Sequence, residues 1–154
     1  MKTETNCKIL CTHISKEFIQ KSSQRVNVID DISIDVRANE FVVILGPGQS
    51  GKSTLLRIIA GLETPTSGRV VLDGRDVSGP GSDRGLVFQS YMLFPWKTVA
   101  GNVELGPRLR GVGKKERREI AQHYIDLVGL NGFEKHYPHQ LSGGQRQRMM
   151  VARA

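Results

Sequence analysis

Apolar residues in the first ninety positions follow patterns that predict several short strands. Residues 32–36 alternate between apolar and polar side chains, the period-two pattern of a half-buried strand in an antiparallel sheet. Residues 41–45 are wholly apolar and rich in β-branched side chains, which predicts a central strand covered on both faces. Residues 70–72 and Val77 flank an Asp-Gly pair, which predicts a hairpin with a two-residue turn. Residues 85–88 predict one more short apolar strand.

Helical spacing of apolar residues appears in three other stretches. From Ser53 the pattern predicts a helix that ends near Gly61 and Pro65. Its apolar positions are Leu55, Leu56, Ile58, Ile59 and Leu62. Residues 114–128 predict an amphipathic helix with one apolar face. That face carries Ile120, Tyr124, Leu127 and Val128. A last helix is predicted to begin at Ser142, so strands and helices together indicate an α/β fold.

Length and composition match one ordinary compact domain. The chain has 154 residues, of which 38% are hydrophobic and 24% are charged. The longest apolar run, residues 41–45, is far shorter than the roughly 18 residues that a membrane-spanning helix needs. The start at Met1 leads into no apolar stretch of the secretory type, which favours a cytoplasmic protein.

Cysteines and basic residues suggest special chemistry only weakly. Cys7 and Cys11 have no second ligand pair in the sequence, so we expect reduced thiols rather than a metal site. The net charge is +7 at pH 7, and a cluster of basic residues accounts for much of it. These residues are Arg108, Arg110, Lys114, Lys115, Arg117 and Arg118. A solvated helix face is the favoured interpretation of the cluster, over contact with nucleic acid.

A glycine-rich loop between a predicted strand and a predicted helix carries the first functional motif. Residues 46–53 fit G-x-x-x-x-G-K-S/T, whose backbone N–H groups cradle phosphates at a helix N-terminus. We expect Lys52 to bind the β- and γ-phosphates of ATP, Ser53 to ligate Mg²⁺ and Thr54 to lie near the α-phosphate. The predicted nucleotide-binding residues are Gly46, Pro47, Gly48, Gln49, Ser50, Gly51, Lys52, Ser53 and Thr54. The alternative is a glycine-rich turn with an incidental lysine.

A second motif, Leu-Ser-Gly-Gly-Gln at residues 141–145, narrows the class of nucleotide-binding protein. Taken alone, the string predicts only a helix start with Ser142 as the N-cap. The string, continued by Arg-Gln-Arg at residues 146–148, resembles the LSGGQ signature of ATP-binding cassette (ABC) ATPases. A serine hydroxyl, glycine N–H groups and a helix N-terminus together form another anion site. The predicted signature residues are Leu141, Ser142, Gly143, Gly144 and Gln145.

The resemblance implies a fold and an assembly. The fold is that of a P-loop NTPase of the ABC type, with an N-terminal antiparallel β subdomain and a helical subdomain. The β subdomain and P-loop core are expected at about 7–90, the Q-loop and helical subdomain at about 91–145, and the start of the signature helix at 142–154. Two such subunits, identical or different, pair head to tail, and the signature of one closes over ATP held by the P-loop of the other.

Two single residues take their expected roles only from the resemblance. Gln89 stands where the family has its Q-loop glutamine, which contacts Mg²⁺ and senses a membrane partner. With Lys52 it makes up the expected catalytic pair. Phe18 stands at the aromatic position whose ring stacks on adenine, although an isolated phenylalanine is more often a core residue.

Residues 89–98 resemble subunits of importers for nitrate, sulfonate and taurine. The resemblance implies a peripheral protein at the cytoplasmic face of the membrane that drives uptake of a small anion. An integral membrane permease is the expected partner and an extracytoplasmic solute-binding protein acts indirectly, while no nucleic acid is expected. The apolar string around Trp96 is either the permease contact or ordinary core packing.

The sequence departs from the family pattern after Ala154. Members continue into a strand with an aspartate for Mg²⁺, a catalytic glutamate and a switch histidine, so the C-terminal part of the core is expected to be absent. Without these groups we expect negligible ATP hydrolysis by this polypeptide alone. The alternatives are a non-hydrolysing nucleotide-binding fragment and a soluble ABC ATPase acting on nucleic acid. His123, His136 and His139 receive no role.

Overall fold

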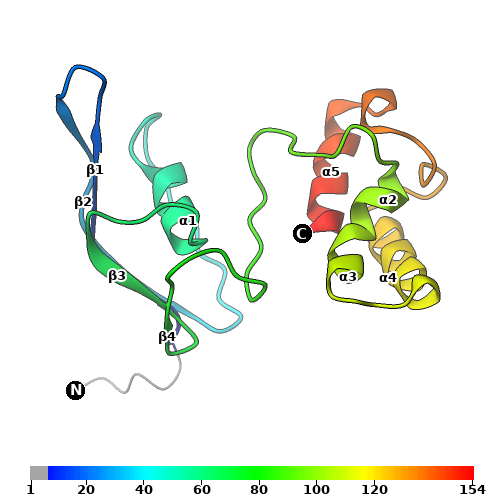
Figure 1. The fold of residues 1–154 in the computed structure, drawn as a ribbon, viewed down its shortest axis with the longest axis horizontal. Coiled ribbons are helices and arrows are strands. Elements are labelled where there is room, and N and C mark those ends of the chain that lie inside the picture. Colours follow the sequence, from blue (N-terminus) through cyan, green and yellow to red (C-terminus); the bar gives the residue numbers. More distant parts are fainter. Residues whose placement is uncertain (1–6) are drawn as a thin grey trace. The chain divides into compact units, whose positions relative to one another are not determined.

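The computed structural model of the protein describes residues 7–154. The start of the chain, on which the expectation about export rests, lies outside the described residues. The chain divides into two compact units, Met1–Leu86 and Val87–Ala154 (Figure 1).

An antiparallel sheet forms most of the first unit. Its four strands lie in the order β2-β1-β3-β4, and every neighbouring pair is antiparallel (Figure 1). The strands are β1 Cys7–Ile19, β2 Arg25–Arg37, β3 Ser67–Leu72 and β4 Arg75–Asp76. β3 and β4 are joined by Asp73 and Gly74, both with positive φ (48° and 75°), as a two-residue hairpin turn requires. The predicted strand within β2 and the predicted hairpin are both confirmed.

One helix packs against this sheet and closes a small core. Helix α1, Lys52–Ile59, confirms the helix predicted from Ser53. Its buried residues Leu55 and Ile58 pack with buried residues of the sheet, because they lie on one face of the helix. The sheet residues of this core are Cys11, Ile14, Ile29 and Val70. Cys7 and Cys11 are free, and burial raises the pKa of the Cys11 thiol to about 11.

The strands predicted at residues 41–45 and 85–88 are not formed. Neither run is a strand, and Phe41 and Leu45 are 90% and 86% exposed. A buried parallel strand is stable only when neighbouring strands satisfy its backbone N–H and C=O groups. Within residues 7–154 no strand pairs with either run, so the predictions of a central strand at residues 41–45 and of a short apolar strand at residues 85–88 are wrong for this structure.

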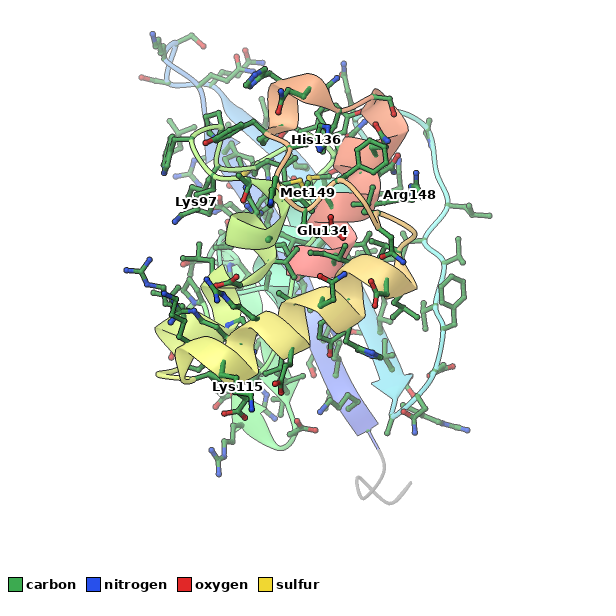
Figure 2. All side chains as sticks on the ribbon, turned by 90° about the vertical axis from the view of Figure 1, so that its right-hand side faces the viewer. Lys97, Lys115, Glu134, His136, Arg148 and Met149 are labelled. Atoms are coloured by element: carbon green, nitrogen blue, oxygen red, sulfur yellow. The ribbon has the colours of Figure 1, made fainter. Side chains whose placement is uncertain are left out.

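Helices are the regular elements of the second unit, residues 87–154. They are α2 Val99–Val103, α3 Leu105–Leu109, α4 Lys114–Leu127, the 3₁₀ helix η1 Pro138–Gln140 and α5 Gly143–Arg153. Their shared core contains Val99, Val103, Ala121, Ile125, Leu130, Leu141, Met149 and Ala152. Met149 is fully buried and points from α5 into this core (Figure 2). Within residues 7–154, no helix has both the length and the apolar character that crossing a bilayer requires.

Helix α4 forms where the sequence predicts it, but its fully buried residues are not the predicted ones. Ala121 and Ile125, one turn apart, are its buried residues, whereas Tyr124 and Leu127 are 44% and 70% exposed. The small side chain of Ala121 permits close packing against the rest of the core, and Ile125 shares its face. The predicted face is therefore wrong for Tyr124 and Leu127, whereas Ile120 and Val128 are half-buried and Val128 packs against the core. Apolar side chains at helical spacing do not by themselves show which face is covered.

Candidate functional site

The glycine-rich loop of the first unit lies against β2 and leads into α1. Gly51 is the N-cap of α1 with φ 83°, a left-handed conformation that favours glycine. A Cβ at this position would lie 2.6 Å from the carbonyl oxygen of Val28 and 3.0 Å from Cγ1 of Ile29. Only glycine fits here, and it brings the loop close to β2. The first turn of α1 contains no acidic residue, so the positive end of the helix dipole is not neutralised there.

Lys52 holds its ammonium group against the loop. Its Nζ atom donates hydrogen bonds to the carbonyl oxygens of Gly46 and Pro47, at 2.9 and 2.5 Å, and to Oγ of Ser50 at 3.0 Å. These three acceptors belong to the motif itself. The loop therefore surrounds the ammonium group of its own lysine, beside the N-terminus of α1.

A pocket of about 270 Å³ brings together seven of the ten predicted nucleotide-binding residues of the first unit, and Gly46, Pro47 and Gly48 do not line it. It is lined by Phe18, Val28, Gln49, Ser50, Gly51, Lys52, Ser53 and Thr54. An aromatic ring on β1 thus shares one pocket with the glycine-rich loop. The Nζ atom of Lys16 lies 4.8 Å from the centroid of the Phe18 ring and 2.6 Å from a carboxylate oxygen of Glu63.

Sequence reasoning missed Val28, which lines this pocket, and Lys16, whose ammonium group lies over the Phe18 ring. A signal for Lys16 was present, because residues two apart on a strand share a face and Lys16 precedes Phe18 by two. Val28 carried no signal of its own. It reaches the pocket because the glycine-rich loop packs on β2, a contact between segments distant in sequence.

The second motif forms the capped start of α5 in the second unit. Ser142 Oγ accepts a hydrogen bond from the backbone N–H of Gln145 at 3.3 Å, and Gln145 Oε1 accepts one from the N–H of Ser142 at 2.8 Å. This reciprocal pair is a capping box. Leu141 is buried in the core, and Gly143 and Gly144 open the helix. The predicted helix start at Ser142 is confirmed.

Gln89 belongs to neither group of residues. It is exposed in a bend at the beginning of the second unit, whereas the glycine-rich loop belongs to the first unit. Phe18 and the glycine-rich loop thus belong to one group of residues in the first unit, whereas residues 141–145 belong to the second unit.

Two arginines of α5 were also missed, and both contact the segment after Gln89. The guanidinium group of Arg146 lies 4.9 Å from the centroid of the Tyr91 ring, and that of Arg153 lies 5.4 Å from the centroid of Phe94. Burial lowers the pKa of Arg153 below its ordinary value. A signal was available, since arginines seven apart lie on one helix face.

Sequence comparisons identify the same family that the motifs at residues 46–53 and 141–145 indicate. The family model described as "ABC transporter" matches residues 29–154. An uncharacterized ABC transporter ATP-binding protein of Methanocaldococcus jannaschii is 52% identical over 146 residues, covering 95% of this chain and 54% of the relative. The nitrate import ATP-binding protein NrtD of Synechocystis sp. is 50% identical, covering 93% of this chain and 53% of the relative. The taurine import ATP-binding protein TauB of Pseudomonas aeruginosa is 48% identical, covering 92% of this chain and 53% of the relative.

Comparison with solved structures indicates the same family for the fold. A dimeric ATP-binding cassette in a post-hydrolysis state, bound to ADP and Pi, has a TM-score of 0.85 and is 32% identical. The match covers 94% of this chain and 68% of that cassette. This chain spans about half the length of the curated relatives it matches. The expected fold and the resemblance on which it rests are confirmed: the chain belongs to the ABC transporter ATP-binding family.

Proposed function

We propose that this chain is the ATP-binding part of a subunit that powers an ABC importer. The observation that carries the proposal is the pocket of the first unit. There an aromatic ring, a lysine ammonium group and an uncapped helix N-terminus meet in about 270 Å³. An aromatic ring suits a nucleobase, and the other two features suit phosphates.

Each residue of the pocket has a proposed role. Phosphate oxygens would replace the loop carbonyls as partners of the Lys52 ammonium group, which then bridges the β- and γ-phosphates. Thr54 offers a hydroxyl near the α-phosphate, and Phe18 stacks on adenine. The backbone cradle consists of Gly46, Pro47, Gly48, Gln49, Ser50 and Gly51.

Mg²⁺ fits the residues present as a companion of the nucleotide. Ser53 is exposed at the pocket and offers one hydroxyl oxygen, the type of ligand that Mg²⁺ takes alongside phosphate oxygens and water. Within residues 7–154 no cluster of three His, Cys, Asp or Glu side chains could hold a metal independently. When bound, the ion would neutralise charge on the β- and γ-phosphates. Gln89 is proposed as a further oxygen ligand.

The signature turn is proposed to act on a second subunit. The hydroxyl of Ser142, the amides of Gly143 and Gly144 and the positive end of α5 suit the γ-phosphate of a nucleotide. Leu141 anchors this turn in the core, and Gln145 holds the cap. Head-to-tail pairing, with a second copy or a related subunit, brings this turn over the other P-loop. The similar solved cassette is a dimer.

The transport role is proposed from the relatives and from one exposed segment. Trp96 is 70% exposed in the segment that follows Gln89, and it offers an apolar contact to an integral membrane permease at the cytoplasmic face. The relatives named for nitrate and taurine import suggest a small anion as the transported solute. A solute-binding protein would act through the permease rather than on this chain.

The pocket also favours a specific alternative, ATP binding without hydrolysis by this chain alone. None of the residues that line the pocket is an aspartate or glutamate. A carboxylate is the usual group that orients an attacking water, so the pocket described here supports binding rather than turnover.

Nucleotide binding to the purified chain tests the proposal. A fluorescent ATP analogue should bind in the presence of Mg²⁺, and Lys52→Ala should weaken binding about 10- to 100-fold, the effect of losing a charge-assisted hydrogen bond. Phe18→Ala should weaken binding of ATP but leave binding of inorganic triphosphate unchanged. Lys21→Ala, an exposed lysine in the turn between β1 and β2, is the matched control and should have no effect.

Phosphate release from ATP, measured on the same samples, separates the two candidates. Binding with no Lys52-dependent release supports the non-hydrolysing alternative, and release that Lys52→Ala abolishes refutes it. Equal affinity of the Lys52→Ala variant and the unaltered chain would disprove both.

A further inference from the structure

The Lys16 ammonium group contacts the Phe18 ring from outside the pocket of the first unit. Its Nζ atom lies 4.8 Å from the ring centroid, within the range of a cation–π contact. Phe18 lines the pocket, whereas Lys16 does not. Phe18 is exposed, and an exposed aromatic side chain changes rotamer freely unless a neighbour holds it. Lys16 is the cation that the structure places on this ring.

Lys16 is itself fixed by two partners in the segment that follows α1. Its Nζ atom lies 2.6 Å from Oε1 of Glu63 and donates a hydrogen bond to the carbonyl oxygen of Thr64 at 2.7 Å. The Lys16 side chain is only 13% exposed, although lysine side chains usually extend into water. A long side chain whose ammonium group has two partners keeps few of its rotamers. The cation therefore stays at one place on the ring.

Two further hydrogen bonds attach the same segment, residues 63–66, to β1. The N–H of Thr66 donates to the carbonyl oxygen of Ser15 at 2.8 Å, and Oγ1 of Thr66 accepts from the N–H of Glu17 at 2.9 Å. The segment comes directly after α1, which begins at the glycine-rich loop. Lys16 therefore connects the aromatic ring to the end of the helix whose start lies at that loop.

We propose that Lys16 is a positioning residue for the nucleobase: anchored by Glu63 and Thr64, its ammonium group holds the Phe18 ring in the orientation that stacks on adenine. This inference deepens the proposed function and rests on it. Because Lys16 contacts the ring and does not line the pocket, it acts on the base half of the nucleotide. The phosphate half is left to the glycine-rich loop.

Two substitutions that change the net charge in opposite directions test this role. Lys16→Met removes the ammonium group, and Glu63→Gln removes the carboxylate that anchors it. A ribose-labelled fluorescent ATP analogue reports binding to the purified chain with Mg²⁺, and inorganic triphosphate is measured by displacement. Lys16→Met should weaken ATP binding about three- to ten-fold and Glu63→Gln about two- to five-fold, the effect of losing or loosening one cation–π contact. Triphosphate affinity should stay within about two-fold in both, because water and salt screen a charge outside the pocket.

Rescue and control variants separate positioning from general destabilisation. Lys16→Arg keeps a cation with donors for both partners, so it should restore ATP affinity to within about two-fold of the unaltered chain. In a Phe18→Ala chain, Lys16→Met should cause no further loss, because the ring on which it acts is gone. Lys8→Met is the matched control on β1. Lys8 pairs with Asp73 at 2.5 Å and takes part in none of the cation–π contacts described within residues 7–154, so both affinities should stay unchanged.

The inference is refuted if Lys16→Met and Glu63→Gln leave ATP affinity unchanged while Lys52→Ala weakens it, a result that leaves the proposed function standing. Opposite effects of the two substitutions, following their opposite charges, also refute it. So does an equal loss of triphosphate affinity that Lys16→Arg does not restore. If circular dichroism shows that Lys16→Met does not fold, Glu63→Gln decides alone. A chain that binds no ATP, or binds it without dependence on Lys52, disproves the proposed function and this inference together.

Discussion

At the scale of single residues, Gly51 shows how one position serves both the fold and the site. Its positive φ and the 2.6 Å approach to the Val28 carbonyl oxygen leave no space for a side chain. Gly51→Ala should therefore destabilise the first unit by about 1–3 kcal/mol, the usual range for a strained left-handed residue. The urea midpoint of unfolding, followed by circular dichroism, measures this effect.

Gly48→Ala supplies the control for that substitution, because a Cβ at Gly48 meets nothing within 4 Å and its φ is not in the left-handed region. Its stability should stay within about 0.5 kcal/mol of the unaltered chain. Equal midpoints for the two variants would show that the loop does not pack on β2 as described.

At the scale of elements, the turn between residues 94 and 98 depends on Asn102. Asn102→Leu is similar in size but leaves the N–H of Phe94 and the carbonyl group of Lys97 without their hydrogen-bond partner, whereas the carbonyl groups of Phe94 and Thr98 keep backbone partners. We expect a loss of about 2–4 kcal/mol of unfolding free energy, because buried polar groups without partners are costly. Fluorescence of Trp96, the only tryptophan in the chain, reports this unfolding directly.

Gln122→Leu on α4 is the comparison for Asn102→Leu. Gln122 is exposed and makes its hydrogen bonds to the side chains of Asp126 and Glu134 at the surface. Its loss should change the unfolding free energy by no more than about 0.5 kcal/mol. A loss below about 1 kcal/mol for Asn102→Leu would mean that water satisfies the turn instead.

Local patterns predicted those elements that local interactions determine. The β3–β4 hairpin follows from Asp73-Gly74, the start of α5 from the capping chemistry of Ser142, and the P-loop from its glycines. Whether residues 41–45 form a central strand, and which face of α4 is buried, depends on the segments that pack against them. The sequence pattern of one segment does not identify those neighbours. The spacing of the α5 arginines places them on one face but does not show what they meet, because Arg146 contacts Tyr91 in a segment distant in sequence. Asn102 contacts residues four to eight positions before it, and a single asparagine forms no recurring pattern.

At the scale of the whole molecule, the run at residues 41–45 is the most exposed apolar segment described. Phe41, Val43 and Leu45 are 90%, 61% and 86% exposed, and their backbone pairs with no strand within residues 7–154. Extended apolar backbone of this kind pairs readily with other chains and binds hydrophobic dyes. We therefore expect the purified chain to self-associate at micromolar concentration and to bind a dye such as anilinonaphthalene sulfonate.

Substituting two of these residues tests whether this run is the cause. Phe41→Lys with Val43→Lys should lower dye fluorescence and the weight-average mass in sedimentation, because charged side chains oppose strand pairing. Leu109→Lys with Leu127→Lys adds the same charge at two isolated apolar residues, 79% and 70% exposed, and should leave both readings nearly unchanged. Equal reductions in the two variants would show that net charge, not the unpaired run, controls the association. A monomeric, dye-free unaltered chain would show that residues 41–45 are covered in solution.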